Sequence, residues 1–437
     1  MKNLRALFVL SLHGCDAADG QRHGPSKPAR LAQNHYVDGL GGSDADSGSI
    51  DQPWKTLDAV SSRTFEPGDR ILFKRGTSYS GCVTIRGDGT PSAPITIGAY
   101  GTGPPPRFTN PNHAVKTGNA MRIRGAHHIV EDLYFHHTAP APAHVESFQE
   151  VWAVGALHVA LGSDHVIIRD NEFAHVPKGI QSYSEHSLIT GNYIHDGNDT
   201  QQDGFLSSPY WGPIGIQLGI GNQEVSYNRI EDMVAQGGEY GADGGAIEID
   251  DGREHKDNIF IHHNTTRHNM GFVEVSYWDD IDKRASSQIA IEDNISRDFQ
   301  SFVLWWAPTT DSVVQNNTII RDDQRAGPLS TVFALDEPPG DILFRENIVL
   351  VDDDHTQSIF AEGLNGAVDD IQHTDNCYWN VDGDDLALGL SSLGPGELQA
   401  DPHFMDYDRE DYRLRPSSPA TGWGAAPATH RAHPPDR

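Results

Sequence analysis

The chain has 437 residues, with 62 acidic against 32 basic side chains and a formal net charge of −30. A hydrophobic fraction of 37% excludes a disordered chain, and 44 glycines with 26 prolines exclude a helical bundle. The charge excludes a general nucleic-acid binder and argues against binding to anionic membrane surfaces.

The first residues have the features of an export signal. Lys2 and Arg5 precede an apolar run at residues 6–12, and residues 12–15 (LHGC) resemble a bacterial lipoprotein box. The resemblance implies lipidation of Cys15, and with it a periplasmic, outer-membrane or secreted protein. We therefore expect a signal segment at residues 1–15, a polar linker at 16–34, and membrane attachment only through a lipid.

A short phrase recurs along the chain: an apolar residue, two polar residues, then asparagine. Spacings of 21 to 36 residues suit the coils of a β-solenoid, with insertions in loops on one side. Asparagines stacked on successive coils can form a side-chain amide ladder at the strand spacing of ~4.8 Å. The ladder is predicted to be structural, with Asp132 in the same role one coil earlier. Its members are Asn171, Asn192, Asn228, Asn264, Asn294, Asn317, Asn347 and Asn376.

A second row of segments alternates apolar and polar residues at period two, as half-buried strands do. These segments are residues 180–184, 216–219, 246–250, 272–276, 302–306, 332–336 and 359–363. The residues expected to point inward are Ile216, Leu218, Ile247, Ile249, Val273, Val275, Val303, Trp305, Phe333 and Leu335. Those expected to point outward include Gln181, Gln217, Glu248, Asp250, Glu274, Ser276, Leu304, Trp306 and Asp336.

Together the two rows predict an all-β fold, a right-handed parallel β-helix of about nine or ten coils with an N-terminal cap. The handedness follows from the preference for right-handed crossovers. We expect the β-helix with its cap at residues 35–400, the coils from roughly 115 to 385, and a C-terminal extension at 401–437. The protein is expected to be a monomer.

Two stretches resemble a known superfamily. Residues 36–108 (YVDGLGGSDADSG to PPPRF) resemble the N-terminal segment of bacterial pectate-lyase-like β-helix proteins, and residues 401–424 resemble their C-terminal ending. The resemblance implies a glycan as partner. This superfamily holds glycosidases, polysaccharide lyases, epimerases and adhesins, so the fold alone does not decide the activity.

Paired carboxylates are the strongest chemical signal. Glu248 and Glu274 should lie in register on adjacent coils, ~4.8 Å apart at the backbone, and Asp250 two residues along the strand at ~6.6 Å. Retaining glycosidases hold their two carboxyls ~5–5.5 Å apart and inverting ones ~6.5–9.5 Å apart. In addition, residues 243–247 (DGGAI) are similar to a segment of β-helix glycosidases in which the aspartate is catalytic, which implies a catalytic role for Asp243. The alternative is a tight turn into the strand. The catalytic candidates are Asp243, Glu248, Asp250 and Glu274.

Aromatic side chains near these carboxylates can stack on sugar rings. Tyr277, Trp278 and Trp306 belong to the adjoining segments, and Tyr210 with Trp211 belongs to a polar insertion that can form the wall of a cleft. We therefore expect them to bind substrate, and the preferred function is glycoside hydrolysis.

A polysaccharide lyase is the runner-up. Glu248, Asp250 and Glu274 are the hard oxygen ligands that Ca²⁺ accepts, and Arg253 with Lys256 can neutralise or bind a uronate. The layout resembles the calcium-dependent chondroitinase B and alginate lyase family, but Ser276 stands about where that pattern has arginine.

Two further readings stay open. A histidine base is possible at His195 or near His262. A non-catalytic glycan-binding solenoid is the third hypothesis for the whole protein.

Overall fold

The computed structural model describes residues 31–111, 119–139, 143–145, 154–198, 200–202, 210–236, 242–250, 254–276, 286–322, 331–335, 340–352, 358–362, 371–383 and 386–425. Contacts divide the chain into two units, residues 1–32 and residues 33–437, and the described strands all belong to the second unit. The proposed signal segment with Cys15, and most of the linker, lie outside the described residues. No helix among the described residues is long and apolar enough to cross a membrane.

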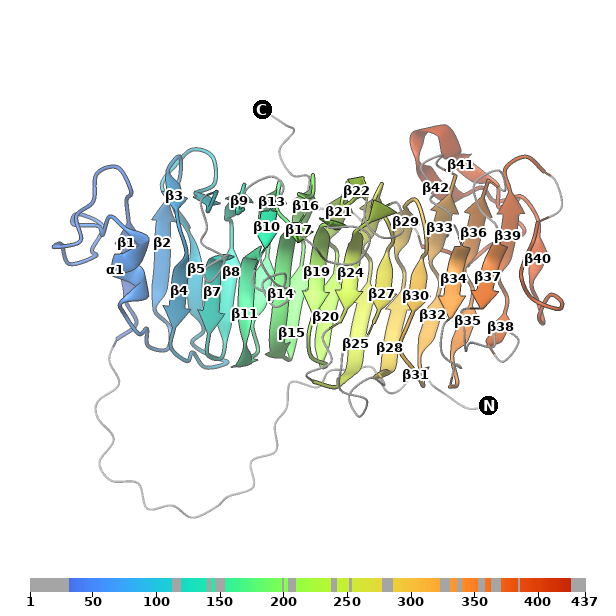
Figure 1. Cartoon of the computed structure of the whole chain (residues 1–437), viewed down its shortest axis with the longest axis horizontal. Helices are drawn as coiled ribbons and strands as arrows, with labels where there is room; N and C mark the ends of the chain where they lie inside the picture. Colours follow the sequence, from blue (N-terminus) through green and yellow to red (C-terminus); the bar gives the residue numbers. More distant parts are fainter. Residues whose placement is uncertain are drawn as a thin grey trace, which may run out of the picture. The chain divides into compact units, whose positions relative to one another are not determined.

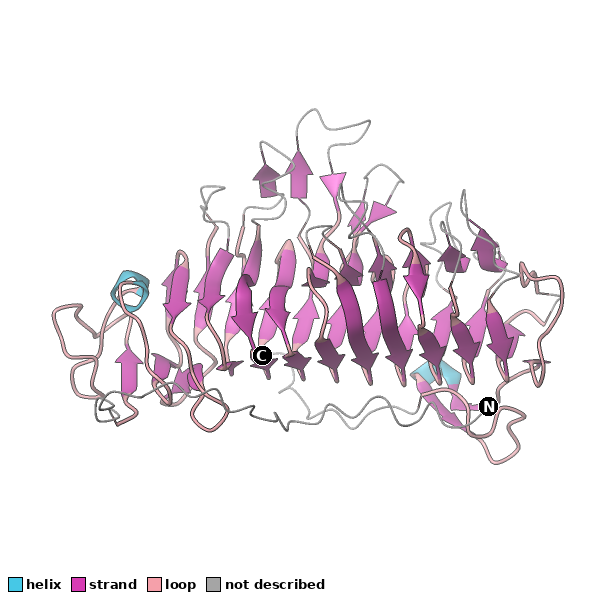
Figure 2. Ribbon diagram, turned by 90° about the horizontal axis from the view of Figure 1, so that it is seen from below, coloured by secondary structure: helices cyan, strands magenta, loops and turns pink. Residues whose placement is uncertain are grey.

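Three long sheets of parallel strands make up this unit (Figures 1 and 2). Within the described residues, the ten-stranded sheet contains β4 (Val83–Arg86), β7 (Asn119–Arg124), β11 (Gly155–Asp164), β14 (Lys178–Glu185), β19 (Ile214–Leu218), β24 (Gly245–Ile249), β27 (Val273–Val275), β30 (Val303–Trp305), β34 (Thr331–Leu335) and β37 (Ser358–Glu362).

The thirteen-stranded sheet follows the ten-stranded sheet in each coil. Its described strands are β1 (Asn34–Val37), β2 (Arg70–Lys74), β5 (Ile95–Tyr100), β8 (His128–Glu131), β12 (Ile167–Arg169), β15 (Ser187–Thr190), β20 (Gln223–Ser226), β25 (Lys256–His262), β28 (Ser286–Glu292), β31 (Thr309–Thr310), β32 (Val313–Gln315), β35 (Leu343–Arg345) and β38 (Gln372–Thr374).

The twelve-stranded sheet closes each coil. Its described strands are β3 (Ser78–Ser80), β6 (Arg107–Thr109), β9 (Tyr134–His136), β13 (Glu172–Ala174), β16 (Tyr193–His195), β21 (Arg229–Glu231), β26 (Thr265–Arg267), β29 (Ile295–Arg297), β33 (Thr318–Arg321), β36 (Ile348–Val351), β39 (Cys377–Asn380) and β40 (Leu398–Gln399).

The remaining described elements are short. They are α1 (Leu57–Ser61), β10 (Ala143–Val145), β17 (Thr200–Gln202), β18 (Tyr210–Trp211), β22 (Ala235–Gln236), β23 (Ala242–Asp243), β41 (Phe404–Asp406), the 3₁₀ turn at Tyr407–Arg409 and β42 (Asp411–Leu414).

This order of strands confirms the predicted all-β parallel β-helix, with ten coils among the described residues. The expected start of the coils near residue 115 is wrong. Strands β4, β5 and β6 already form a complete coil, because β4 pairs with β7, β5 with β8 and β6 with β9. The segment expected to cap the solenoid therefore also supplies strands to all three sheets.

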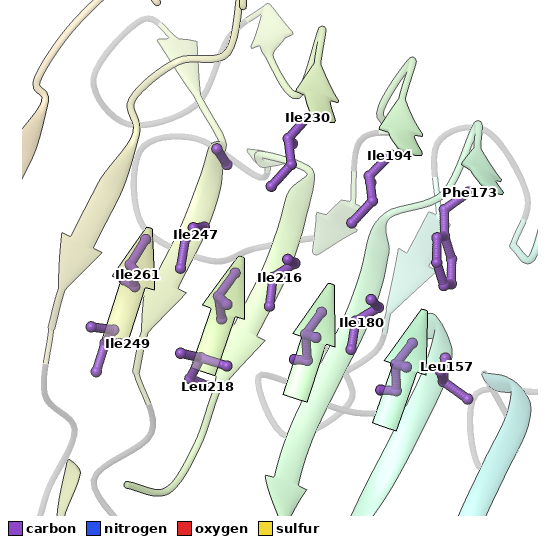
Figure 3. Packing of buried hydrophobic residues seen from close by; sticks show 14 of the residues in the cluster. Leu157, Phe173, Ile180, Ile194, Ile216, Leu218, Ile230, Ile247, Ile249 and Ile261 are labelled. Carbon is purple, nitrogen blue, oxygen red and sulfur yellow. The ribbon is translucent and has the colours of Figure 1, made fainter. Parts of the chain in front are cut away.

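The core is built from side chains stacked coil upon coil (Figure 3). In the ten-stranded sheet, Leu157, Ile180, Ile216 and Ile247 are in register on four successive strands. All four are at most 1% exposed. The ten residues predicted to point inward are likewise buried, so the period-two pattern gave the orientation of these strands correctly.

The asparagine ladder forms as predicted. From Asn171 to Asn376 each Nδ2 donates a hydrogen bond to Oδ1 of the next asparagine at 2.9 to 3.1 Å. At the last rung, Nδ2 of Asn376 donates to Oε1 of the buried Glu397 at 2.7 Å. Every ladder side chain is therefore buried with its donors and acceptors paired.

The prediction for Asp132 is wrong by one residue. Each ladder asparagine follows a residue in the left-handed region, such as Asp170 (φ 55°) before Asn171, and Asp132 (φ 60°) occupies that preceding position. Leu133 stands at the ladder position, and its backbone N–H donates to Oδ1 of Asn171 at 3.1 Å. Aspartate suits the left-handed position because a short polar side chain tolerates positive φ.

The C-terminal segment lies on the outside of the twelve-stranded sheet. Phe404 and Tyr412 join a second apolar cluster with Ile320, Ile348 and Leu350 of β33 and β36. Residues 401–425 thereby cover apolar side chains on the outer face of that sheet.

A buried histidine makes the fold sensitive to acid. His128 is fully buried in β8, in register with Ile95, and burial lowers its pKa to about 4. The unfolded value is about 6.5, so the stability from neutral His128 is complete above that pH and is lost as the pH falls towards 4. We expect this group to reduce the unfolding free energy by about 2 kcal/mol between about pH 7 and about pH 5.

Urea unfolding at both pH values measures this effect. The variant His128→Leu places an apolar side chain next to Ile95 and should show a flatter pH dependence than the wild type. An equally steep loss in the variant would contradict the role given to His128.

Candidate active site

The outer face of the ten-stranded sheet carries a continuous row of polar side chains, here called the polar column. Its members are in register on six successive strands from β7 to β27, and Leu304 follows on β30. Five intervals of ~4.8 Å give a row of about 24 Å. The polar column consists of Arg122, His158, Gln181, Gln217, Glu248 and Glu274.

Charge changes sign along this column. Arg122 and His158 lie at one end, two amides lie in the middle, and Glu248 and Glu274 lie at the other end. Glu248 and Glu274 are both half-buried and pair directly across β24 and β27. This is the register that the alternation predicted for the two glutamates.

Asp250 extends the acidic end. It follows β24, is half-buried, and its backbone N–H donates to the carbonyl oxygen of Leu218 at 3.1 Å. In the same way, the backbone N–H of Ser276 donates a hydrogen bond to the carbonyl oxygen of Ile249, and that of Trp306 donates to the carbonyl oxygen of Val275. Asp250, Ser276 and Trp306 therefore occupy one position on three successive coils, as predicted.

The middle of the column contains a buried cation. Lys178, at the start of β14, is 2% exposed, and its Nζ donates to Oε1 of Gln217 at 3.1 Å. Nε2 of Gln181 donates to the same Oε1 at 2.8 Å. These two donors fix the amide orientation of Gln217.

Nε2 of Gln217 is left as a buried donor without a partner among the described residues. An unpaired buried donor costs about 1–3 kcal/mol. Gln217 is 0% exposed, so this donor adds a cost to the folded state that the described residues do not offset.

The cationic end is joined to the middle by hydrogen bonds. Nδ1 of His158 lies 2.7 Å from Oε1 of Gln181, and Nε2 of Gln181 lies 3.4 Å from the phenolic oxygen of Tyr183. Because Oε1 only accepts, this geometry requires a proton on Nδ1 of His158. Nε2 is then the ring nitrogen that can accept a proton when the imidazole is neutral.

Gly219 leaves room for Tyr183. A Cβ at Gly219 would overlap Cε1 of the Tyr183 ring, whereas a Cβ at Gly245 in the same sheet would lie 3.8 Å from its nearest neighbour. We expect Gly219→Ala to lower the unfolding free energy by about 1–3 kcal/mol, and Gly245→Ala to change it much less. Urea unfolding measures both.

A double-mutant cycle tests the cause of that cost. If the Tyr183 ring is responsible, Gly219→Ala should cost less in a Tyr183→Ala background than in the wild type. An equal cost in both backgrounds would show that Gly219 is needed for another reason.

Several predicted site residues are only partly described. The backbone of Asp243 ends β23, which pairs antiparallel with β22, and Gly244 has φ +116°. The segment therefore includes a tight turn into β24 that requires glycine. Tyr210 and Trp211 form β18, which pairs with β17, but their side chains and that of Asp243 lie outside the described residues, as do Arg253, Tyr277 and Trp278 altogether.

The structure does not bring the other predicted groups to the polar column. Lys256 begins β25 of the thirteen-stranded sheet, is buried, and donates from Nζ to the carbonyl oxygen of Glu254 at 2.9 Å. His195 belongs to the twelve-stranded sheet and is hydrogen-bonded to Asp196 at 2.7 Å. His262 ends β25 and lies 3.1 Å from Glu224.

Sequence reasoning missed the cationic half of the site. Arg122, His158 and Lys178 were not predicted to share a face with the glutamates. Residues 119–124 (NAMRIR) and 155–159 (GALHV) show the same alternation as the later strands, so extending the column by two coils would have found Arg122 and His158. Lys178 lies outside the alternation and had no such signal.

Comparisons with known proteins agree on the fold. No family model and no curated protein matches the sequence. Among solved structures, a GH136 lacto-N-biosidase from Eubacterium ramulus has a TM-score of 0.50 and 14% identity over 79% of this chain and 67% of that one. XylC in complex with xylose has a TM-score of 0.50 and 12% identity, over 84% of this chain and 86% of that one. Pectate lyase Pel9A has a TM-score of 0.49 and 12% identity, over 90% of this chain and 91% of that one. The similarities to the lacto-N-biosidase and to XylC concern the fold alone, and they agree with a parallel β-helix.

Proposed function

We propose that this protein is an enzyme that cleaves the glycosidic bonds of an oligosaccharide or polysaccharide, by hydrolysis at the acidic end of the polar column. The observation that carries the proposal is the direct pairing of Glu248 with Glu274 across β24 and β27. A backbone separation of ~4.8 Å suits the carboxyl separation of ~5–5.5 Å in retaining glycosidases. One glutamate acts as general acid and the other as nucleophile, with Asp250 and Asp243 as further candidates.

Other features support glycan binding on this face. The half-buried Trp306 lies one coil beyond Ser276 and can stack on a sugar ring. Solved β-helix structures with related folds include a lacto-N-biosidase and a complex with xylose. Cleavage of a glycan outside the cytoplasm also fits the export signal proposed for residues 1–15 of this protein.

A polysaccharide lyase is the second candidate, and the cationic half of the column favours it. Elimination from a uronate requires neutralisation of the substrate carboxylate and a base for the adjacent carbon. Lys178 and Arg122 can supply the positive charge, and Nε2 of His158 can accept the proton. Glu248, Asp250 and Glu274 form an oxygen donor set of the type that Ca²⁺ takes, and the bound ion would add positive charge at the acidic end.

One assay separates these functions. The purified protein is incubated with neutral and uronate-containing polysaccharides, with Ca²⁺ or with chelator. We expect new reducing ends without ultraviolet absorbance. Absorbance from an unsaturated uronate would establish the lyase instead, and its loss with chelator would assign the carboxylates to Ca²⁺. Retention on immobilised glycan with neither signal would establish a binding protein.

A further inference from the structure

A second cluster of chemically competent side chains lies at the turns between the ten-stranded and thirteen-stranded sheets. Asp164 ends β11, His165 is the turn residue that follows it, and His186 is the turn residue between β14 and β15. Both histidines are in the left-handed region, with φ of 53° and 51°. The same turn on successive coils therefore places the two imidazoles one above the other.

The contacts in this cluster converge on one carboxylate. Nδ1 of His165 lies 2.9 Å from Oδ2 of Asp164, and Nδ1 of His186 lies 2.9 Å from Oδ1 of Asp164. The two rings are stacked with centroids 4.8 Å apart. One ligand atom from each of the three residues lies within 4.8 Å of the other two.

We propose that Asp164, His165 and His186 bind a divalent transition-metal ion of the Zn²⁺ type. Two imidazole nitrogens and a carboxylate oxygen form a donor set that such ions prefer. Bonds of about 2.0–2.2 Å place two ligands of a tetrahedral ion about 3.3 Å apart. Each ring nitrogen would have to move about 0.4 Å further from its carboxylate oxygen, and the two ring nitrogens, which lie within 4.8 Å of one another, would have to approach by up to about 1.5 Å. The three side chains are 37 to 43% exposed, which leaves the remaining coordination positions to water.

A third imidazole lies beside the cluster. His127 is the turn residue one coil earlier, and its ring centroid lies 4.7 Å from that of His165, with the two ring planes tilted by 36°.

The ion would join β11 to β14. These are the strands that carry His158 and Gln181 in the polar column, and their pairing is interrupted by a register shift between Val159 and Ser163. Pairing resumes at Ser163 with Ser184 and Asp164 with Glu185, at the C-terminal ends of the two strands. A metal ion bound there would hold these ends together. The site is thus a cross-link between coils, separate from the acidic end of the column.

Titration calorimetry with Zn²⁺ on the full chain, with no histidine tag, tests the proposal. We expect saturable binding of one ion per chain, and a thermal midpoint raised on the order of 2 °C at saturating Zn²⁺. The double variant His165→Asn/His186→Asn should weaken binding at least tenfold. Asparagine tolerates the left-handed region, so the turns are kept.

The matched control is His263→Asn/His268→Asn. It removes two histidines that also have left-handed φ, of 55° and 56°, at turns elsewhere, and it should bind Zn²⁺ like the wild type. With Cu²⁺ as a second probe, the spin-resonance spectrum should show two coordinating nitrogens in the wild type and lose them in the first double variant. Equal binding by all three proteins, or no saturable binding by the wild type, would overturn the proposal.

Discussion

Glu248→Gln and Glu274→Gln should each lower the rate of glycan cleavage by a factor of about 10²–10⁴, and both variants should fold normally. Glutamine keeps the size and hydrogen-bonding shape of glutamate but can neither donate a proton as a general acid nor attack as a carboxylate. Both side chains are half-buried on the outer face, so neither substitution disturbs the stacked core. Initial rates on the best substrate of the panel measure the loss.

Glu172→Gln is the matched control for this prediction. Glu172 is a half-buried glutamate in β13 on a different sheet, 3.4 Å from His195, and its replacement should leave the rate unchanged. If both column variants kept wild-type activity, the acidic end would not be the catalytic centre. Calorimetry with Ca²⁺ on the same variants separates metal ligands from acid and nucleophile, because loss of Ca²⁺ binding together with activity would indicate the lyase.

The fold could be predicted from the sequence because successive coils of the solenoid repeat the same local pattern. The recurring asparagine and the alternation of apolar and polar residues in the strands can both be recognised in the sequence, and they led to the correct register from Gln181 to Leu304. The errors of the prediction also arose from its dependence on this repeat. Where the repeat lacks its asparagine, at Leu133, the alignment slipped by one residue, and the coil formed by β4, β5 and β6 was not counted.

The site was predicted only where it follows the alternation. Glu248 and Glu274 could be placed because their strands align directly, whereas Lys178 reaches the column from the start of β14, outside the column register. Such a contact depends on the length and direction of the side chain, which the spacing of residues along the sequence does not indicate. Likewise, Asp164, His165 and His186 meet because two turns stack, although the residues are 21 to 22 positions apart.

Asn264→Ala should lower the unfolding free energy by at least about 3 kcal/mol, since several buried groups lose their partners together. Nδ2 of Asn264 donates to the carbonyl oxygens of Val225 and His262 at 2.9 and 3.1 Å, and to Oδ1 of Asn294 at 3.0 Å. Its Oδ1 accepts from the backbone N–H and Nδ2 of Asn228, both at 3.0 Å. Alanine replaces none of these bonds, and the site is 1% exposed.

The ladder position explains why the loss should exceed that of an ordinary buried hydrogen bond. In a solenoid each coil is held only by its neighbours, and Asn264 bonds the coil before it and the coil after it. Asn34→Ala, on an exposed position of β1, is the control and should change the urea midpoint little. Hydrogen exchange should accelerate at the N–H of Asn228, whose acceptor is removed. A loss below about 1 kcal/mol would mean that the strand pairing holds the coils without the ladder.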